Sequence, residues 1–115
     1  MSRDEVRGRV EAFVADFHRG WERAGRPPGS NFEQAAVAWA GELAVVVGAH
    51  FTTGASTGEE GVLSGSSAHD PSLETITEVK VEADRATVCS VVENGSVPTY
   101  YEYRLVRVDE QWRIC

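Results

Sequence analysis

The chain has 115 residues, 42% of them hydrophobic and 25% charged, which is the composition of a single folded domain spanning 1–115. Its 18 acidic and 11 basic residues give a net charge of -7, so general binding to nucleic-acid phosphates is disfavoured. No apolar run approaches the ~20 residues of a membrane span and no apolar leader follows Met1, so we expect a cytoplasmic protein that does not engage a membrane.

The first segment of the chain is predicted to be a helix. Apolar residues recur there at helical spacing and would form one buried face: Val6, Val10, Phe13, Val14, Phe17 and Trp21. Ser2, with Glu5 three residues later, is a capping-box signal for the start of the helix. Gly25 and the prolines at 27–28 predict its end, because proline cannot continue a helix.

A second helix is predicted directly after this break. Ser30 and Glu33 repeat the capping-box spacing at its start. An apolar stripe follows at helical spacing: Phe32, Ala36, Trp39, Leu43, Val46 and Val47. We expect this helix to end near residue 47, although the β-branched run at 45–47 is also compatible with the start of a strand.

The second half of the chain predicts a sheet. Residues 52–70 are rich in glycine, serine and threonine, which predicts a long loop that ends in a turn at Asp70-Pro71. Apolar and polar residues then alternate over 79–84, 86–93, 101–108 and 112–115, with short polar separators typical of hairpins. Ile76 is out of phase with Val79, which predicts a bulge. The sequence therefore predicts an α+β fold, with N-terminal helices packed on a curved antiparallel sheet.

The negative charge is concentrated in the middle of the chain. Residues 1–30 carry a net charge of +1, residues 31–84 carry -8 and residues 85–115 carry 0. This block is compatible with a solvated acidic surface or with a surface for a basic partner, which complementary charge would steer into contact. The candidate partner-binding residues are Glu59, Glu60, Asp70, Glu74, Glu78, Glu82 and Asp84.

Several residues could supply an acid–base pair to a pocket: Asp16, His18, His50, His69, Tyr101 and Tyr103. We expect Asp16 and His69 to face solvent, and His50 to cap the second helix. Tyr101 and Tyr103 alternate in phase with Leu105, which predicts a place in the core or in a pocket wall. The sequence contains no metal-ligand spacing, phosphate-binding loop or nucleophile motif, so we expect no metal, no cofactor and no catalytic residue.

Four segments together resemble a known fold. They are a long first helix with Phe17, Trp21 and Glu22, the stretch HDPSLETI at 69–76, the stretch YYEYRL at 100–105, and the ending WRI at 112–114. These resemble the cone-shaped nuclear transport factor 2-like fold, and within it the immunity proteins of bacterial polymorphic toxin systems. That family usually has an aromatic residue, such as tyrosine, where this chain has His69.

The resemblance implies a non-enzymatic immunity protein that binds and neutralises a cognate protein toxin. Many such toxins are nucleases with basic active sites, which an acidic inhibitor can cover. An alternative is a small-molecule-binding protein or an isomerase- or cyclase-type enzyme that uses the pocket of the cone. The candidate pocket-lining residues are Phe17, His18, Trp21, Tyr101 and Tyr103. A third possibility is a homodimer, because exposed sheets in this fold often pair.

Overall fold

The computed structural model describes residues 2–25, 32–54, 68–93, 95 and 97–115. Two helices, α1 (Ser2–Gly25) and α2 (Phe32–His50), precede four strands. The strands are β1 (Glu74–Glu82), β2 (Arg85–Val92), β3 (Thr99–Val108) and β4 (Gln111–Ile114). They form one antiparallel sheet in the order β1-β2-β3-β4. The prediction of an α+β fold with helices first and a meander second is confirmed.

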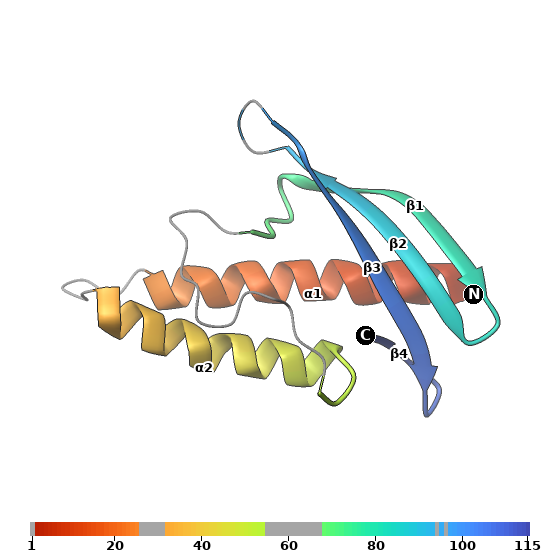
Figure 1. Cartoon of the computed structure of the whole chain (residues 1–115), viewed down its shortest axis with the longest axis horizontal. Helices are drawn as coiled ribbons and strands as arrows, with labels where there is room; N and C mark the ends of the chain where they lie inside the picture. The colour runs from red at the N-terminus through yellow and green to blue at the C-terminus, as the bar shows by residue number, and fades with distance from the viewer. Residues whose placement is uncertain (1, 26–31, 55–67, 94, 96) are drawn as a thin grey trace.

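The helices lie on one face of the sheet. Figure 1 shows α1 running beneath the strands and α2 lying alongside α1. The second helix continues to His50 rather than ending near residue 47, because Val46 and His50 are both buried. The β-branched run at 45–47 therefore belongs to the helix, since tertiary packing overrides its weak preference for strand.

The core lies between α1 and the inner face of the sheet. In β2, the inward positions Ala86, Val88, Ser90 and Val92 are buried, whereas the residues between them are partly exposed. The period of two explains this pattern, since successive side chains of a strand point to opposite faces. Helix α1 supplies Val6, Val10, Phe13, Val14 and Phe17 to the same core.

Strand β1 contains the predicted bulge. Ile76 pairs with Ser90, but the next paired residue is Glu78, opposite Cys89, so the register shifts between them. The strand is preceded by the predicted turn, in which the amides of Leu73 and Glu74 donate to the carbonyl of Asp70 at 2.9 and 2.8 Å. The bulge and the turn together place Ile76 and Glu74 on the inner face.

The two helices contact each other closely near the end of α1. Gly20 allows this approach, because a Cβ atom at that position would lie 3.2 Å from Cβ of Glu42. The carboxylate of Glu42 also accepts a hydrogen bond from Arg23 at 2.7 Å. Neither α1 nor α2, the helices of the described part of the chain, combines the length and hydropathy that a bilayer-spanning helix needs.

Candidate functional site

Four polar side chains meet inside the fold and form what we call the interior cluster: His69, Glu74, Ser90 and Tyr103. Oε1 of Glu74 lies 2.7 Å from Nδ1 of His69, and Oε2 accepts a hydrogen bond from Ser90 Oγ at 2.6 Å. The hydroxyl of Tyr103 donates to the same Oε2 and lies 3.0 Å from His69 Nδ1. Three strands and the segment before β1 therefore converge on one carboxylate.

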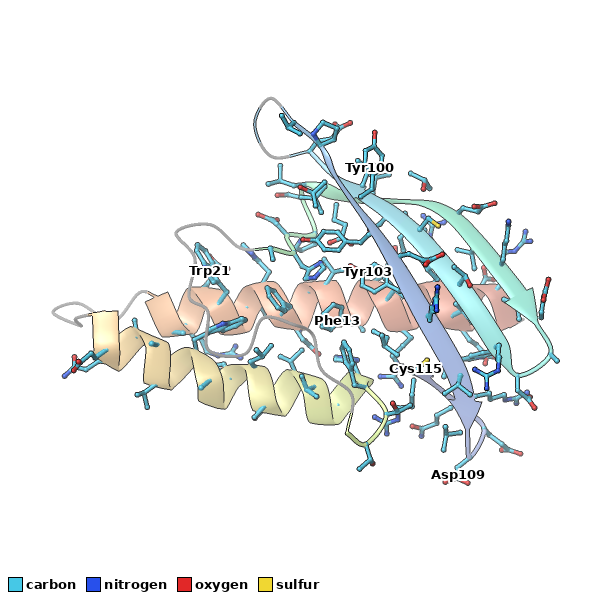
Figure 2. All side chains as sticks on the ribbon, viewed as in Figure 1. Phe13, Trp21, Tyr100, Tyr103, Asp109 and Cys115 are labelled. Carbon is cyan, nitrogen blue, oxygen red and sulfur yellow. The ribbon has the colours of Figure 1, made fainter. Side chains whose placement is uncertain are left out.

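Aromatic rings enclose the interior cluster. The ring of His69 lies edge-on to Phe13 and Phe17, with centroid distances of 5.1 and 4.8 Å, and 4.6 Å from the ring of Tyr101. Figure 2 shows Tyr103 pointing from β3 toward Phe13 on α1, and their centroids lie 6.0 Å apart. These rings exclude water, which strengthens each electrostatic interaction within the cluster.

The cluster holds Glu74 in its ionised form. Burial by itself would raise the pKa of Glu74, but hydrogen bonds from His69, Ser90 and Tyr103 keep that pKa below its ordinary value. Burial and the neighbouring Glu74 charge both raise the pKa of Tyr103, so its hydroxyl stays protonated and donates. A carboxylate without these partners would be costly at this depth.

The interior cluster is saturated by its own members. Both oxygens of Glu74 have partners, and the Glu74 side chain is only 1% exposed. A general base must bring a lone pair within hydrogen-bond reach of a substrate. Glu74 borders one hollow of about 230 Å³, between α1 and the start of β1, whose wall also includes Arg7 and Glu11. In the described structure the interior cluster connects β1, β2, β3 and the segment before β1 through hydrogen bonds.

Two expectations about these residues are wrong. His69 does not face solvent: it is 5% exposed, because the chain brings it onto the aromatic side chains of α1 before β1 begins. Glu74 does not belong to an exposed acidic surface, because it is the first residue of β1 and points to the inner face.

The predicted pocket residues separate into two groups. Phe17, Tyr101 and Tyr103 surround the His69 ring. His18 and Trp21 instead stack on each other, with centroids 5.9 Å apart. Nε2 of His18 lies 3.4 Å from Glu22 and 3.8 Å from Asp70, while its Nδ1 is buried and has no hydrogen-bond partner in the described structure.

Asp16 and His50 form a second, partly buried contact, which the sequence did not predict. Nε2 of His50 lies 2.7 Å from Oδ2 of Asp16, and its Nδ1 lies 2.9 Å from Nη1 of Arg9. Burial would raise the pKa of Asp16, but hydrogen bonds from His50 and Arg19 lower it below its ordinary value. Asp16 is thus engaged rather than free in solvent, and His50 anchors the end of α2 to α1.

The other predicted acidic residues lie at several places. Glu78 and Glu82 point outward from β1, as expected from their phase relative to Val79. However, Oε1 of Glu78 lies 3.6 Å from Nζ of Lys80, and Glu82 stands opposite Arg85 in the strand register, so this outer face carries mixed charge. Asp70 accepts hydrogen bonds from Ser72. Glu59 and Glu60 lie outside the described residues.

Folding gathers a different set of carboxylates, which we call the acidic end. Figure 1 shows the start of α1, the β1–β2 turn and the β3–β4 turn at the same end of the molecule. Six exposed acidic residues of the described chain lie there: Asp4, Glu5, Glu82, Asp84, Asp109 and Glu110. Three exposed arginines accompany them: Arg3, Arg85 and Arg107. The amide of Arg107 donates to the carbonyl of Asp84 at 2.8 Å, which joins the β1–β2 turn to the last residues of β3.

A hollow of about 420 Å³ opens within the acidic end. Glu5 and Glu110 stand on its wall with Trp112, and Arg9 and Gln111 complete its polar lining. The guanidinium of Arg9 is already engaged, since its Nη1 contacts His50 and donates to the carbonyl of Ala49 at 3.2 Å. Trp112 itself is buried, so the two carboxylates are the groups that suit a lysine or arginine side chain entering the hollow, whose charge they would pair.

No known protein family, curated protein or solved structure matches this chain.

Proposed function

We propose that the protein is a non-enzymatic immunity protein that binds and neutralises a basic protein toxin through its acidic end. The observation that carries the proposal is the hollow with Glu5, Glu110 and Trp112 on its wall. The sequence resemblance to immunity proteins of polymorphic toxin systems supports the same function. Asp84 and Glu82, which were predicted to bind a partner, belong to the acidic end.

The mechanism is stoichiometric capture. The net charge of -7 attracts a basic domain over a distance, and the acidic end orients it. A lysine or arginine of the toxin enters the hollow between Glu5 and Glu110, and the surrounding carboxylates pair with neighbouring basic groups. A nuclease needs such basic groups to hold phosphate, so covering them removes its activity.

The interior cluster supports this surface indirectly. Glu74 and Ser90 hold β1 and β2 together, and Tyr103 connects β3 to the same carboxylate. A rigid sheet keeps the β1–β2 and β3–β4 turns in a fixed position, which lowers the conformational entropy lost on binding.

The experiment identifies the partner and then tests protection. A photo-crosslinking amino acid at position 110 captures contacting proteins in the native cells, and mass spectrometry identifies them. A chain with the same amino acid at Tyr100, at the opposite end of β3, is the matched control (Figure 2). We expect a basic protein captured from position 110 only. Expressed alone, the captured protein should arrest cell growth. Co-expression of the 115-residue chain in equal amount should restore growth.

Charge reversal separates this proposal from its alternatives. Glu5→Lys with Glu110→Lys should abolish protection and reduce affinity for the captured protein by more than about 100-fold. Glu93→Lys, which reverses a carboxylate at the end of β2, is the control and should retain both. If the double variant protects as well as the natural chain, the acidic end is not the binding surface. Protection at amounts far below that of the toxin would instead indicate enzymatic turnover.

One observation favours a second candidate, a small-molecule-binding protein or isomerase- or cyclase-type enzyme. Glu74, a buried carboxylate with a histidine and a tyrosine as partners, borders the 230 Å³ hollow between α1 and β1. Widening of that hollow would give a ligand access to an acid–base pair. A ligand screen by thermal shift, repeated on Glu74→Gln, tests it: a ligand that stabilises the natural chain but not the variant would support this function.

A further inference from the structure

Helix α2 exposes an apolar face that no described segment covers. Its outward residues are Glu33, Gln34, Val37, Ala38, Ala40, Gly41, Ala44, Val45, Gly48 and Ala49. Val37 is 75% exposed and Val45 is 71% exposed. A helix that is apolar on both its inner and its outer face is characteristic of one that is buried on both.

This face is also almost without charge. Glu33, in the first turn, is its one ionised residue within the described part of the helix. The chain as a whole carries -7, so two copies repel each other over most of their surfaces. The face of α2 is therefore the region where a second copy approaches with the least repulsion and buries the most apolar surface.

The outward residues have a two-fold pattern. Glu33, Val37, Gly41, Val45 and Ala49 recur every four residues and form one ridge, which we call the α2 ridge. The ridge is symmetric about Gly41, with a valine four residues away on each side. Apart from the neighbouring residues and backbone of α2 itself, no described atom lies within 4 Å of the place a Cβ would take at Gly41, so a second backbone has room to approach there.

The charges at the two ends of the α2 ridge are complementary. Glu33 lies at one end. At the other end the carbonyl of Ala49 accepts hydrogen bonds from Arg113 at 2.7 Å and from Arg9 at 3.2 Å. Eight residues of helix, about 12 Å, separate each end from Gly41. An antiparallel pair that crosses at Gly41 thus brings Glu33 of one copy near the arginines of the other, whereas a parallel pair opposes the two Glu33 carboxylates.

We propose that two copies of this chain form a homodimer through antiparallel α2 ridges that cross at Gly41. Val37 of each copy packs against Val45 of the other. A hollow of about 490 Å³ beside the ridge, lined by Ala40, Ala44, Gly48 and Phe51 among others, receives the side chains of the second copy. The interface is isologous and closes as a dimer. It uses none of the carboxylates of the acidic end and does not depend on the proposed function.

The test is the mass of the purified full chain in sedimentation velocity, measured across a dilution series. We expect the natural chain to sediment at twice its 12.5 kDa and to dissociate on dilution. Val45→Glu should raise the dimer dissociation constant by more than about 100-fold, because the interface would bury an unpaired charge. Val97→Glu, at an exposed valine after β2, is the matched control and should not change it. Circular dichroism verifies that both variants fold.

Further variants test the antiparallel geometry and the crossing at Gly41. Glu33→Arg and Arg113→Glu should each weaken the dimer, and the two changes together should restore most of its affinity, since each pair is then complementary again. Gly41→Cys, placed in a chain with Cys89→Ser and Cys115→Ser, should form a disulfide between the two copies on mild oxidation. A natural chain that remains a 12.5 kDa monomer at every concentration overturns the proposal, even if α2 then captures another protein.

Discussion

Nδ1 of His69 and Oε1 of Glu74 lie 2.7 Å apart. The two residues stand at opposite ends of a turn, and both side chains are buried. This contact joins the segment before β1 to the strand itself. Ser90 and Tyr103 complete the arrangement from β2 and β3. Each partner of the carboxylate is therefore also a connection between elements, and the stability of the sheet depends on the charge state of Glu74.

Replacing Glu74 with glutamine should lower the free energy of unfolding at pH 7 by about 1–3 kcal/mol. The amide group of glutamine presents N–H groups where the carboxylate accepts hydrogen bonds, so at least one buried donor loses its acceptor. Urea unfolding measures the change. Glu78→Gln, at an exposed position on the outer face of the same strand, is the control and should change the free energy far less.

The natural chain should lose stability in acid through the same residue. The pKa of Glu74 is lower in the folded state than its ordinary value, so the folded state binds a proton less readily than the unfolded chain does. The stabilisation is complete above the ordinary glutamate pKa and is lost as the pH falls through the lower, folded value. Urea unfolding from pH 7 to below pH ~4 should show a smaller decline for Glu74→Gln than for the natural chain.

Tyr103→Phe should cost more stability than Tyr101→Phe. The hydroxyl of Tyr103 donates to the buried Glu74 carboxylate, and hydrogen bonds to charged groups contribute about 1.5–3 kcal/mol. The hydroxyl of Tyr101 donates to the carbonyl of Ala68 at the long distance of 3.4 Å. Thermal unfolding compares the two variants, which remove the same atom from neighbouring positions on one face. Equal losses of stability would show that the hydrogen bond to the ionised Glu74 carboxylate contributes no more than the one to the carbonyl of Ala68.

Gly8→Ala should stabilise the protein by about 0.5–1 kcal/mol, because alanine favours helix and nothing in the described structure crowds a Cβ at position 8. Gly20→Ala should gain less, since its Cβ would lie only 3.2 Å from Cβ of Glu42 on α2. Gly20→Leu should be destabilising, because the larger side chain separates the helices. Chemical denaturation measures the free energy of unfolding of the three variants and so gives their order of stability.

Glu110→Gly should stabilise the β3–β4 turn by about 1 kcal/mol. Glu110 has a φ angle of 65° and Asp109 has one of 49°, a left-handed backbone that glycine adopts without a steric penalty. Gln111→Gly, one residue later in β4, is the control and should destabilise, since glycine weakens a strand. If Glu110 also binds a toxin, the stabilised variant should protect cells less well than the natural chain.

The order and type of the elements could be predicted because the patterns that specify them are local. Helical spacing from Val6 to Phe17 and alternation from Ala86 to Val92 each reflect one face of one element. The bulge after Ile76 was predictable for the same reason, since it is a change of phase within one strand. The end of α2 was not, because it depends on the contact of His50 with Asp16 of another helix.

The candidate site depended on contacts between distant segments. His69 and Tyr103 are 34 residues apart, and nothing local to either residue indicates that both meet Glu74. Glu5 and Glu110 lie near opposite ends of the chain and share a hollow only once α1 crosses beneath the sheet. Sequence patterns report which face of an element is buried, because burial repeats with the period of that element. Which buried or charged residues become neighbours is a property of how the faces are packed together, and here that packing created both the interior cluster and the acidic end.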